Sequence, residues 1–210
     1  MFNYENVTEA KGRVGIQDPP LARYLFQRTA SAWLWLAVRL FVGYSFVEAA
    51  FRKFDNPAWM DGSGRGILGY WKAALGTMTS AVQGPAGAPV IKYDWYRSFI
   101  QLLVDTNSGG WFSYLIAFGE LAVGVALILG AFVGVAAHGG LLMNMAYMLA
   151  GTTGANPVLA LLGGLLILAW KNAGYIGLDY FLLPLIATRL RRPAAAAPTA
   201  RVPIPAAQAA

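Results

Sequence analysis

The sequence predicts an all-α membrane protein: a four-transmembrane-helix bundle with a long, helix-containing extracytoplasmic loop between the first and second helices. The composition is the first indication, because 57% of the 210 residues are hydrophobic and only 12% are charged, which is atypical of a soluble domain. The second is a series of apolar stretches of spanning length, since about 20 residues of α-helix cross a hydrocarbon core of roughly 30 Å.

The composition also excludes several kinds of chemistry. The chain has no cysteine, which removes disulfides, thiolate catalysis, iron–sulfur clusters and cysteine-based zinc sites. A single histidine, His138, argues against bis-histidine haem ligation within the chain. We therefore expect no metal and no covalently bound cofactor. The net charge of +6 indicates lipid contact and membrane topology, and no nucleic-acid partner.

Residues 1–30 are polar and form a predicted cytoplasmic arm, in which residues 21–29 resemble an interfacial amphipathic helix. The first span is expected at residues 31–51. Arg39 lies inside this span, and Glu48 lies near its other end, close enough to the interface to be solvated.

Residues 52–110 form a long mixed segment that we expect outside the membrane. Helices are predicted near residues 66–75 and 94–105, the second with Trp95, Phe99, Leu102 and Leu103 on one face. The segment is too long for a simple connection, which indicates a cap or a partner-docking surface.

The other spans are expected at residues 111–130, at about 134–151, and at about 158–170 with a continuation to residue 184. The membrane domain would thus cover residues 31–188, followed by an Ala/Pro-rich, disordered cytoplasmic tail at 189–210. Four spans place both ends on one side, and the basic cluster that begins at Arg189 predicts that this side is the cytoplasm.

Glu120 lies near the middle of the second span, where burial of a carboxylate costs a few kcal/mol or more. It is either a proton-handling or ligand-binding acid, or one half of a structural ion pair. Helix rise places Glu120 and Asn144 about 10–12 Å deep, and Arg39 and His138 about 18–21 Å deep. We therefore predict that Arg39 pairs with Glu120, directly or through one water.

An antiparallel bundle could gather Arg39, Glu120, His138 and Asn144 around one site beneath the loop at residues 93–100. A neutral apolar ring could then bind there, with its carbonyls hydrogen-bonded to Arg39, Asn144 or protonated His138. The alternative is a packed polar cluster with no room for a ligand.

Several motifs together resemble the DoxX-type membrane proteins. They are Arg39 with Gly43 and Lys53, GELAVGVALILG at 119–130, Asn156-Pro157, and AGYIGLDYFLLP at 173–184. The YDWYRSFI loop at 93–100 is more similar to the DoxD branch, named after the small membrane subunit of thiosulfate:quinone oxidoreductase. The resemblance implies a four-helix protein of a bacterial or archaeal plasma membrane. It also implies electron transfer from thiosulfate to a membrane quinone, with a DoxA-like partner subunit.

Three functions remain open at this point. The first is a DoxD-like subunit of a thiosulfate:quinone oxidoreductase, with quinone as a substrate. Its candidate residues are Glu120, Arg39 and His138 for catalysis, and Asn144, Trp95 and Tyr96 for quinone binding. The second is a non-catalytic accessory or scaffold subunit of a larger respiratory or photosynthetic complex. The third, a transporter for a sulfur oxyanion, ranks last because no broken-helix pair is evident.

Overall fold

The computed structural model describes residues 7–10, 13–16, 18–81 and 83–190. The regular structure of the described chain is helical apart from one short antiparallel hairpin, β1 Val7–Ala10 and β2 Arg13–Ile16, and an isolated bridge between Ser80 and Gly84. The all-α class is therefore confirmed for the body of the protein, and the hairpin was not predicted. The tail predicted at 189–210 lies outside the described residues, except for the end of the last helix.

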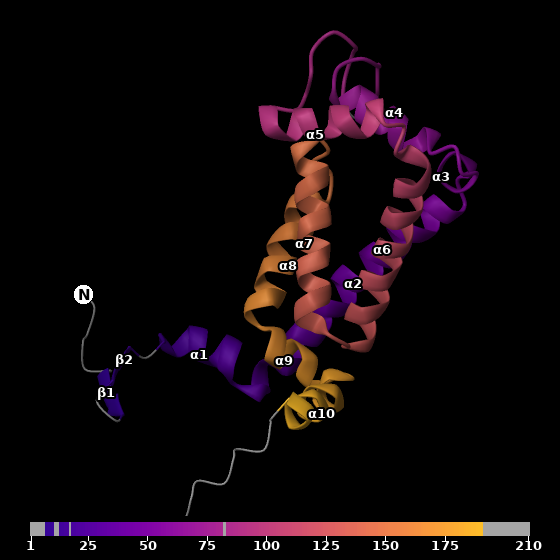
Figure 1. The fold of residues 1–210 in the computed structure, drawn as a ribbon. Helices are drawn as coiled ribbons and strands as arrows, with labels where there is room; N and C mark the ends of the chain where they lie inside the picture. The colour runs from indigo at the N-terminus through magenta and orange to yellow at the C-terminus, as the bar shows by residue number, and fades with distance from the viewer. Residues whose placement is uncertain (1–6, 11–12, 17, 82, 191–210) are drawn as a thin grey trace, which may run out of the picture.

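The predicted amphipathic stretch of the N-terminal arm is a helix, α1 Pro20–Gln27. A short turn, η2 Thr29–Ser31, joins it to the first long helix. Trp35 Nε1 donates to the carbonyl of Leu25 at 2.7 Å, and Asn172 Nδ2 donates to the carbonyls of Leu25 and Arg28. These bonds attach α1 to the lower end of the bundle, from which it projects in Figure 1.

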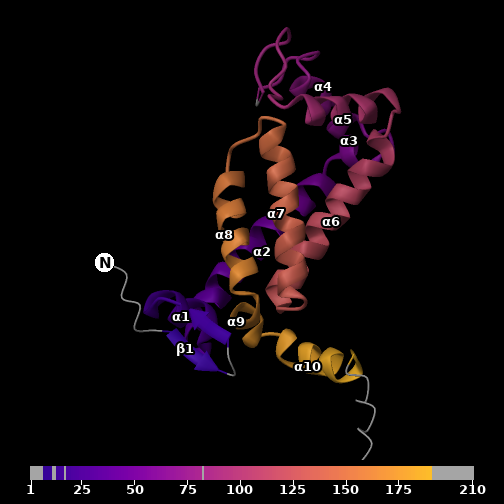
Figure 2. The same ribbon diagram turned by 60° about the vertical axis from the view of Figure 1, so that its left-hand side comes forward.

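Four apolar helices run up and down beside one another: α2 Ala32–Phe54, α6 Gly109–Leu129, α7 Val133–Leu149 and α8 Asn156–Leu168 (Figures 1 and 2). α2 and α6 approach closely, because a Cβ at Gly43 would lie 2.9 Å from the carbonyl oxygen of Gly124. After α8 the chain continues in α9 Trp170–Tyr175 and α10 Asp179–Leu190, at the lower end.

Two of these helices are long and apolar enough to cross a membrane: Thr29–Phe54, which is η2 with α2, and α6. α7 and α8 are apolar but shorter. Only 33% and 28% of the most apolar windows of the two long helices are buried inside the molecule. Large side chains such as Phe41, Leu115 and Phe118 are exposed on them, and exposed apolar faces of this kind mark contact with a membrane or with another protein.

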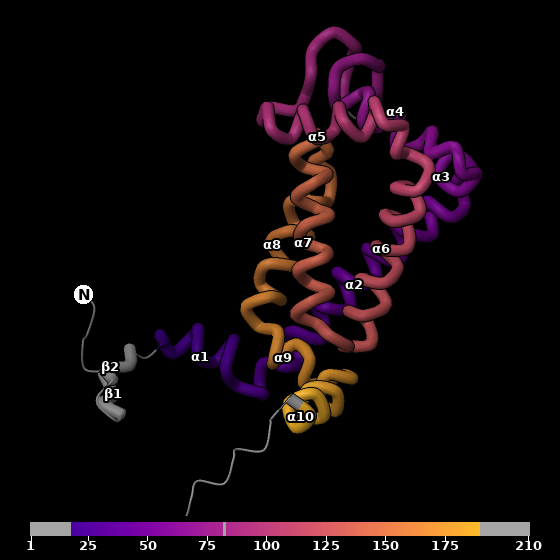
Figure 3. The backbone as a smooth tube through the Cα atoms, viewed as in Figure 1, coloured from indigo at the N-terminus to yellow at the C-terminus, as the bar shows by residue number. Residues whose placement is uncertain are grey.

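The segment between α2 and α6 forms a cap over the upper end of the bundle, which the backbone trace in Figure 3 shows clearly. It contains α3 Pro57–Met60, α4 Arg65–Ala74 and α5 Asp94–Asp105, so both predicted cap helices are confirmed. The cap has its own core, which also includes Ala150 at the top of α7. The core comprises Ile67, Trp71, Ala74, Ile91, Tyr96, Ile100, Leu103 and Ala150.

The apolar face predicted for α5 is mostly turned outward, and only its fourth member, Leu103, is buried. Trp95, Phe99 and Leu102 are exposed, whereas the buried stripe is Tyr96, Ile100 and Leu103. These three residues follow the i, i+4, i+7 spacing of one helix face. Both stripes are apolar. Which of them is buried depends on how α5 packs against α4 and α7, and the sequence of α5 alone does not determine that packing.

Candidate functional site

A cavity of about 510 Å³ lies beneath the cap, between the upper parts of α2, α6 and α7. Its volume lies in the range of small-molecule sites, and its lining is mostly aromatic and aliphatic, as in such sites. The aromatic lining residues are Phe46, Trp59, Tyr70, Trp71, Tyr96, Phe99, Phe112 and Tyr147. Among the few polar lining groups are Lys53, Glu120 and Asn144. The sequence left two alternatives open for this region, a ligand site and a packed polar cluster, and the structure has a cavity there.

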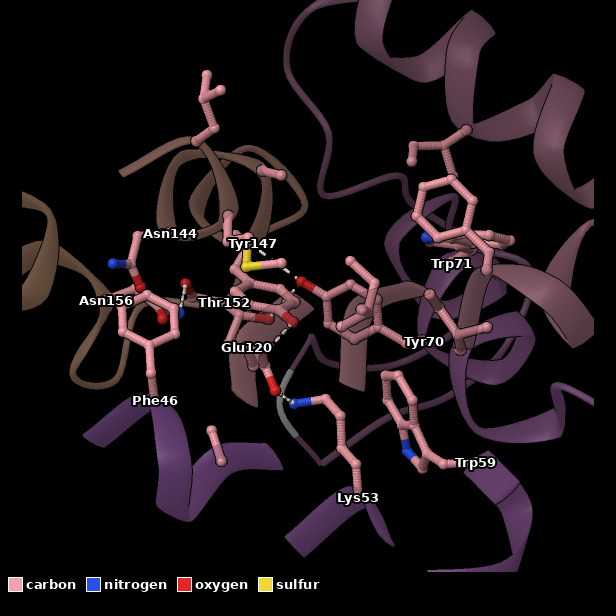
Figure 4. Close-up of a pocket in the computed structure, with 18 of the residues that line it drawn as sticks. Phe46, Lys53, Trp59, Tyr70, Trp71, Glu120, Asn144, Tyr147, Thr152 and Asn156 are labelled. Atoms are coloured by element: carbon pink, nitrogen blue, oxygen red, sulfur yellow. Dashed lines mark hydrogen bonds and ion pairs between the residues drawn. The ribbon is translucent and has the colours of Figure 1, made fainter. Parts of the chain in front are cut away.

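Glu120 lies in the cavity wall at the centre of a hydrogen-bonded trio with Lys53 and Tyr147 (Figure 4). Its side chain is almost completely buried. Oε2 accepts a hydrogen bond from Lys53 Nζ at 2.6 Å, and Oε1 accepts one from the Tyr147 hydroxyl, also at 2.6 Å. Each carboxylate oxygen therefore has a donor, which offsets the cost of removing the charge from water.

Lys53 brings the compensating positive charge from the last turn of α2. Its Nζ lies 5.1 Å from the ring centroid of Trp59 and 5.8 Å from that of Tyr147, distances at which aromatic rings attract a cation. The side chain is 15% exposed. Lys53 is thus held by Glu120 and two rings, and it is not a free cation for an anionic ligand.

The predicted pair of Arg39 and Glu120 was wrong. Arg39 Nη1 donates to the carbonyl of Ala173 at 2.7 Å and Nη2 donates to that of Ile176 at 2.8 Å. Arg39 lies at the level of Gly130, at the lower end of α6, about 15 Å below Glu120 by helix rise. α2 also continues to Phe54, past the predicted end of the span, which brings Lys53 to Glu120 instead.

Arg39 belongs to a second polar cluster, the lower knot, formed by Arg39, Gly130, Gly177 and Asp179. Gly130 and Gly177 pack against the guanidinium group. The carboxylate of Asp179 accepts hydrogen bonds from the backbone N–H groups of Phe132 and Val133, where α7 begins, a favourable place for a negative charge. The lower knot fastens the lower ends of α2, α6 and α7 to the α9–α10 turn, so we assign Arg39 a structural role.

His138 and Trp95 also lie away from the cavity. His138 is exposed on α7, where its Nδ1 bonds the carbonyl of Gly134 at 2.7 Å, and it lines a separate surface groove with Trp170. Trp95 is 65% exposed on the outer face of α5. Depth along the helix placed His138 near the site but gave no information on the rotation of α7, and Trp95 lies on the exposed face of α5, so neither residue lines the cavity.

Tyr96 and Asn144 do line the cavity, as predicted. The Tyr96 hydroxyl donates to the carbonyl of Ala146 at 2.9 Å. Asn144 is 2% exposed, and its Nδ2 has no hydrogen-bond partner among the described residues. An unsatisfied buried donor of this kind costs about 1–3 kcal/mol, and a ligand that offers an acceptor would remove that cost.

The outer wall of the cavity contains Tyr70, which sequence reasoning missed together with Lys53 and Tyr147. The Tyr70 hydroxyl donates to the carbonyl of Tyr147 and accepts from Thr152 at 2.8 Å. Burial raises the pKa of Tyr70 to about 12 and also raises the pKa of Tyr96. Both phenols are therefore neutral donors at physiological pH. Tyr147 follows Asn144 by one helical turn, a spacing that could have identified it.

The described residues contain no cluster of three or more His, Asp or Glu side chains that could hold a metal ion. The chain matches no protein-family profile, no curated protein and no solved structure. The resemblance to DoxX-type proteins therefore stays a prediction, and function has to be argued from the cavity.

Proposed function

We propose that this chain is a membrane protein that binds the ring of a quinone in the cavity beneath its cap. It would act as a DoxD-like membrane subunit associated with electron transfer to the quinone pool. The observation that carries the proposal is an aromatic cavity with a buried, unpaired amide donor, Asn144, and a hydrogen-bonded trio of Lys53, Glu120 and Tyr147.

A neutral, planar ligand with carbonyl acceptors suits this lining best. Aromatic side chains offer stacking surfaces, and rotation of the Asn144 amide would turn its unpaired Nδ2 toward one carbonyl. In Figure 4, Asn144 and Phe46 lie on one side of Glu120, and Lys53 and Trp59 lie on the other. The ring would lie between them, with its second carbonyl toward the ammonium of Lys53, which has N–H groups beyond the one that it donates to Glu120.

The trio would handle the protons of quinone chemistry. Reduction of a quinone to a quinol takes up two electrons and two protons, so the site needs a donor that can be reprotonated between the two transfers. The ammonium group of Lys53 would give one proton to each quinone oxygen in turn and would recover each proton from water at its exposed side, while Glu120, held by Tyr147, keeps it in place. The electrons would come from a redox centre on a partner subunit, because this chain offers no cysteine for one.

The cavity is better suited to bind a quinone than to bind thiosulfate. A sulfur oxyanion would face the carboxylate of Glu120, and the positive charge of Lys53 is already neutralised. We therefore propose that thiosulfate, if it is the electron donor, is oxidised on a DoxA-like or other partner.

The proposal includes a placement in the plasma membrane of a bacterium or archaeon, with four spans, the cap outside and both termini in the cytoplasm. It is supported by the exposed apolar faces of α2, α6, α7 and α8. It is further supported by the basic residues at the lower end, which include Arg28, Lys171 and Arg189.

Labelling of single introduced cysteines tests this placement, and no other residue of the chain would react, because the natural chain has no cysteine. Ala86 in the cap and Ala187 on α10 are both exposed. We expect a membrane-impermeant maleimide to label Ala86→Cys in intact cells and to label Ala187→Cys only after permeabilisation. Labelling of Ala187→Cys in intact cells would overturn the topology.

Removal of the unpaired amide tests the binding site. In Asn144→Leu, the affinity for a tailless quinone such as ubiquinone-0, measured by equilibrium binding to the protein in nanodiscs, should fall about tenfold. The melting temperature should stay the same or rise, because a buried unsatisfied donor is lost. His138→Leu is the control outside the cavity and should bind as the wild type does. Wild-type affinity in Asn144→Leu, or an equal loss in His138→Leu, would refute the site.

The accessory-subunit function remains the second candidate, favoured by the exposed aromatic side chains of Tyr93 and Trp95 at the edge of the cap. Such side chains are typical anchors of protein interfaces. A stoichiometric partner that is released by Trp95→Ala and retained by Asn144→Leu would support it.

A further inference from the structure

The exposure of the lining residues shows where the cavity reaches the outside. All of them are described, and only two are exposed: Phe99 on α5, at 44%, and Leu142 on α7, at 70%. On the α2 side, the small residues Ser45 and Ala49 are half-buried. The mouth of the cavity is therefore bordered by apolar or small side chains.

The roof of the cavity is closed by the cap. Trp71, Tyr96 and Ile100 line the cavity and belong to the packed cap core, which reaches Ala150 at the top of α7. The hydroxyl of Tyr96 and that of Tyr70 both bond carbonyls near that end of α7. The path from the solvent above the cap is thus occupied by packed and hydrogen-bonded side chains.

The mouth opens instead on the side of the bundle, at the depth of its apolar surface. Leu142 lies about 10 Å below the upper end of α7 by helix rise. The neighbouring exposed residues on the same two helices, Leu102 and Met145, are also apolar. Because the residues around the opening are apolar, the opening faces lipid rather than water when the bundle spans a membrane.

We infer that the ligand reaches the cavity sideways from the outer leaflet, and that its long apolar tail leaves between Phe99 and Leu142. This inference rests on the proposed function. A cavity of about 510 Å³ holds a ring and the start of a chain, so a longer tail has to remain in the lipid. The ligand class is therefore a membrane-soluble molecule with one polar ring and a long hydrocarbon tail.

The ring and the tail of the ligand should contribute differently to its binding affinity. A tail that lies in lipid both before and after binding changes its surroundings little, so it adds little to the affinity. Narrowing the mouth, in contrast, obstructs the tail of the bound ligand. A tailless ring only passes the mouth, so it enters more slowly but keeps its affinity at equilibrium.

Binding of ubiquinone-0 and of decylubiquinone to the full chain in nanodiscs tests this, with each dissociation constant expressed as a mole fraction in the membrane. In the wild type the two constants should agree within about threefold. Leu142→Trp should weaken decylubiquinone about tenfold or more and change ubiquinone-0 less than about threefold. Met145→Trp is the matched control, exposed on the same helix but outside the lining, and should leave both unchanged.

The outcomes distinguish this inference from the proposed function. If the wild type binds ubiquinone-0 and rejects decylubiquinone, the side opening is refuted and the ring site stands. Equal losses for both quinones in Leu142→Trp, or a Met145→Trp effect of the same size, also refute the opening. If neither quinone binds, the proposed function fails and this inference fails with it.

Discussion

Replacing Glu120 by glutamine should lower the melting temperature of the protein by roughly 6–12 °C. The substitution leaves the ammonium group of Lys53 near the cavity without its counter-charge, and breaking a buried ion pair costs about 3–5 kcal/mol. We expect the lower part of that range, because Lys53 is partly exposed and can turn toward water. For a chain of this size, 1 kcal/mol corresponds to about 2–4 °C.

A double-mutant cycle identifies the partner of Glu120. Lys53→Gln combined with Glu120→Gln should cost clearly less than the sum of the single losses, because the second substitution removes an interaction that is already broken. Arg39→Gln with Glu120→Gln is the matched control and should be additive within about 0.5 kcal/mol. Additive losses for Lys53, or strong coupling for Arg39, would show that the pairing in the structure is wrong.

Gly130→Ala should be at least as damaging, because it disrupts the lower knot. Gly130 ends α6 with φ +69°, and a Cβ there would lie 2.1 Å from Nη1 of Arg39 and 2.9 Å from Cα of Gly177. The left-handed conformation costs about 1–2 kcal/mol for a residue with a Cβ, and overpacking typically adds about 1–3 kcal/mol. Thermal unfolding of the purified protein measures the loss.

Gly154→Ala separates the two contributions. Gly154 also has a positive φ, +43°, but a Cβ there would meet no atom within 4 Å. This variant should therefore show only the conformational cost, and Gly130→Ala should be less stable than Gly154→Ala by about 1–3 kcal/mol. Equal stability of the two variants would mean that the guanidinium group does not occupy the place assigned to it.

The helices could be predicted from sequence because apolar runs alternate with polar segments over whole helix lengths. The ends of α6 and both cap helices lie within two residues of the predicted positions. Asn144 and Tyr96 were correctly placed at the cavity, because each lies at the right height and on a face that turns inward.

The partners of the charged residues could not be predicted in this way. Depth along a helix follows from residue number, but rotation about the helix axis depends on packing between helices. Arg39 and His138 share a predicted depth, yet one is buried in the lower knot and the other is exposed. Lys53 was read as a loop residue because the sequence does not show that α2 extends to Phe54.

The break after α9 was missed for a similar reason. The sequence predicted one continuous segment through residues 171–184, whereas α9 ends at Tyr175 and α10 begins at Asp179. Gly177 packs against Gly130, and Asp179 bonds the first backbone N–H groups of α7. Both contacts join segments that are far apart in the chain, so no local pattern reports them.

Photoaffinity labelling tests the central claim, a quinone-type ligand in the cavity, most directly. The full chain in nanodiscs would be irradiated with an azido-substituted quinone, and the modified peptides mapped with and without an excess of the parent quinone. We predict competed labelling on cavity-lining segments from different parts of the chain, around Phe46–Lys53, Tyr96–Leu103 and Leu142–Tyr147. Uncompeted labelling spread over the exposed faces of α2, α6 and α8, with none in the cavity, would contradict the account.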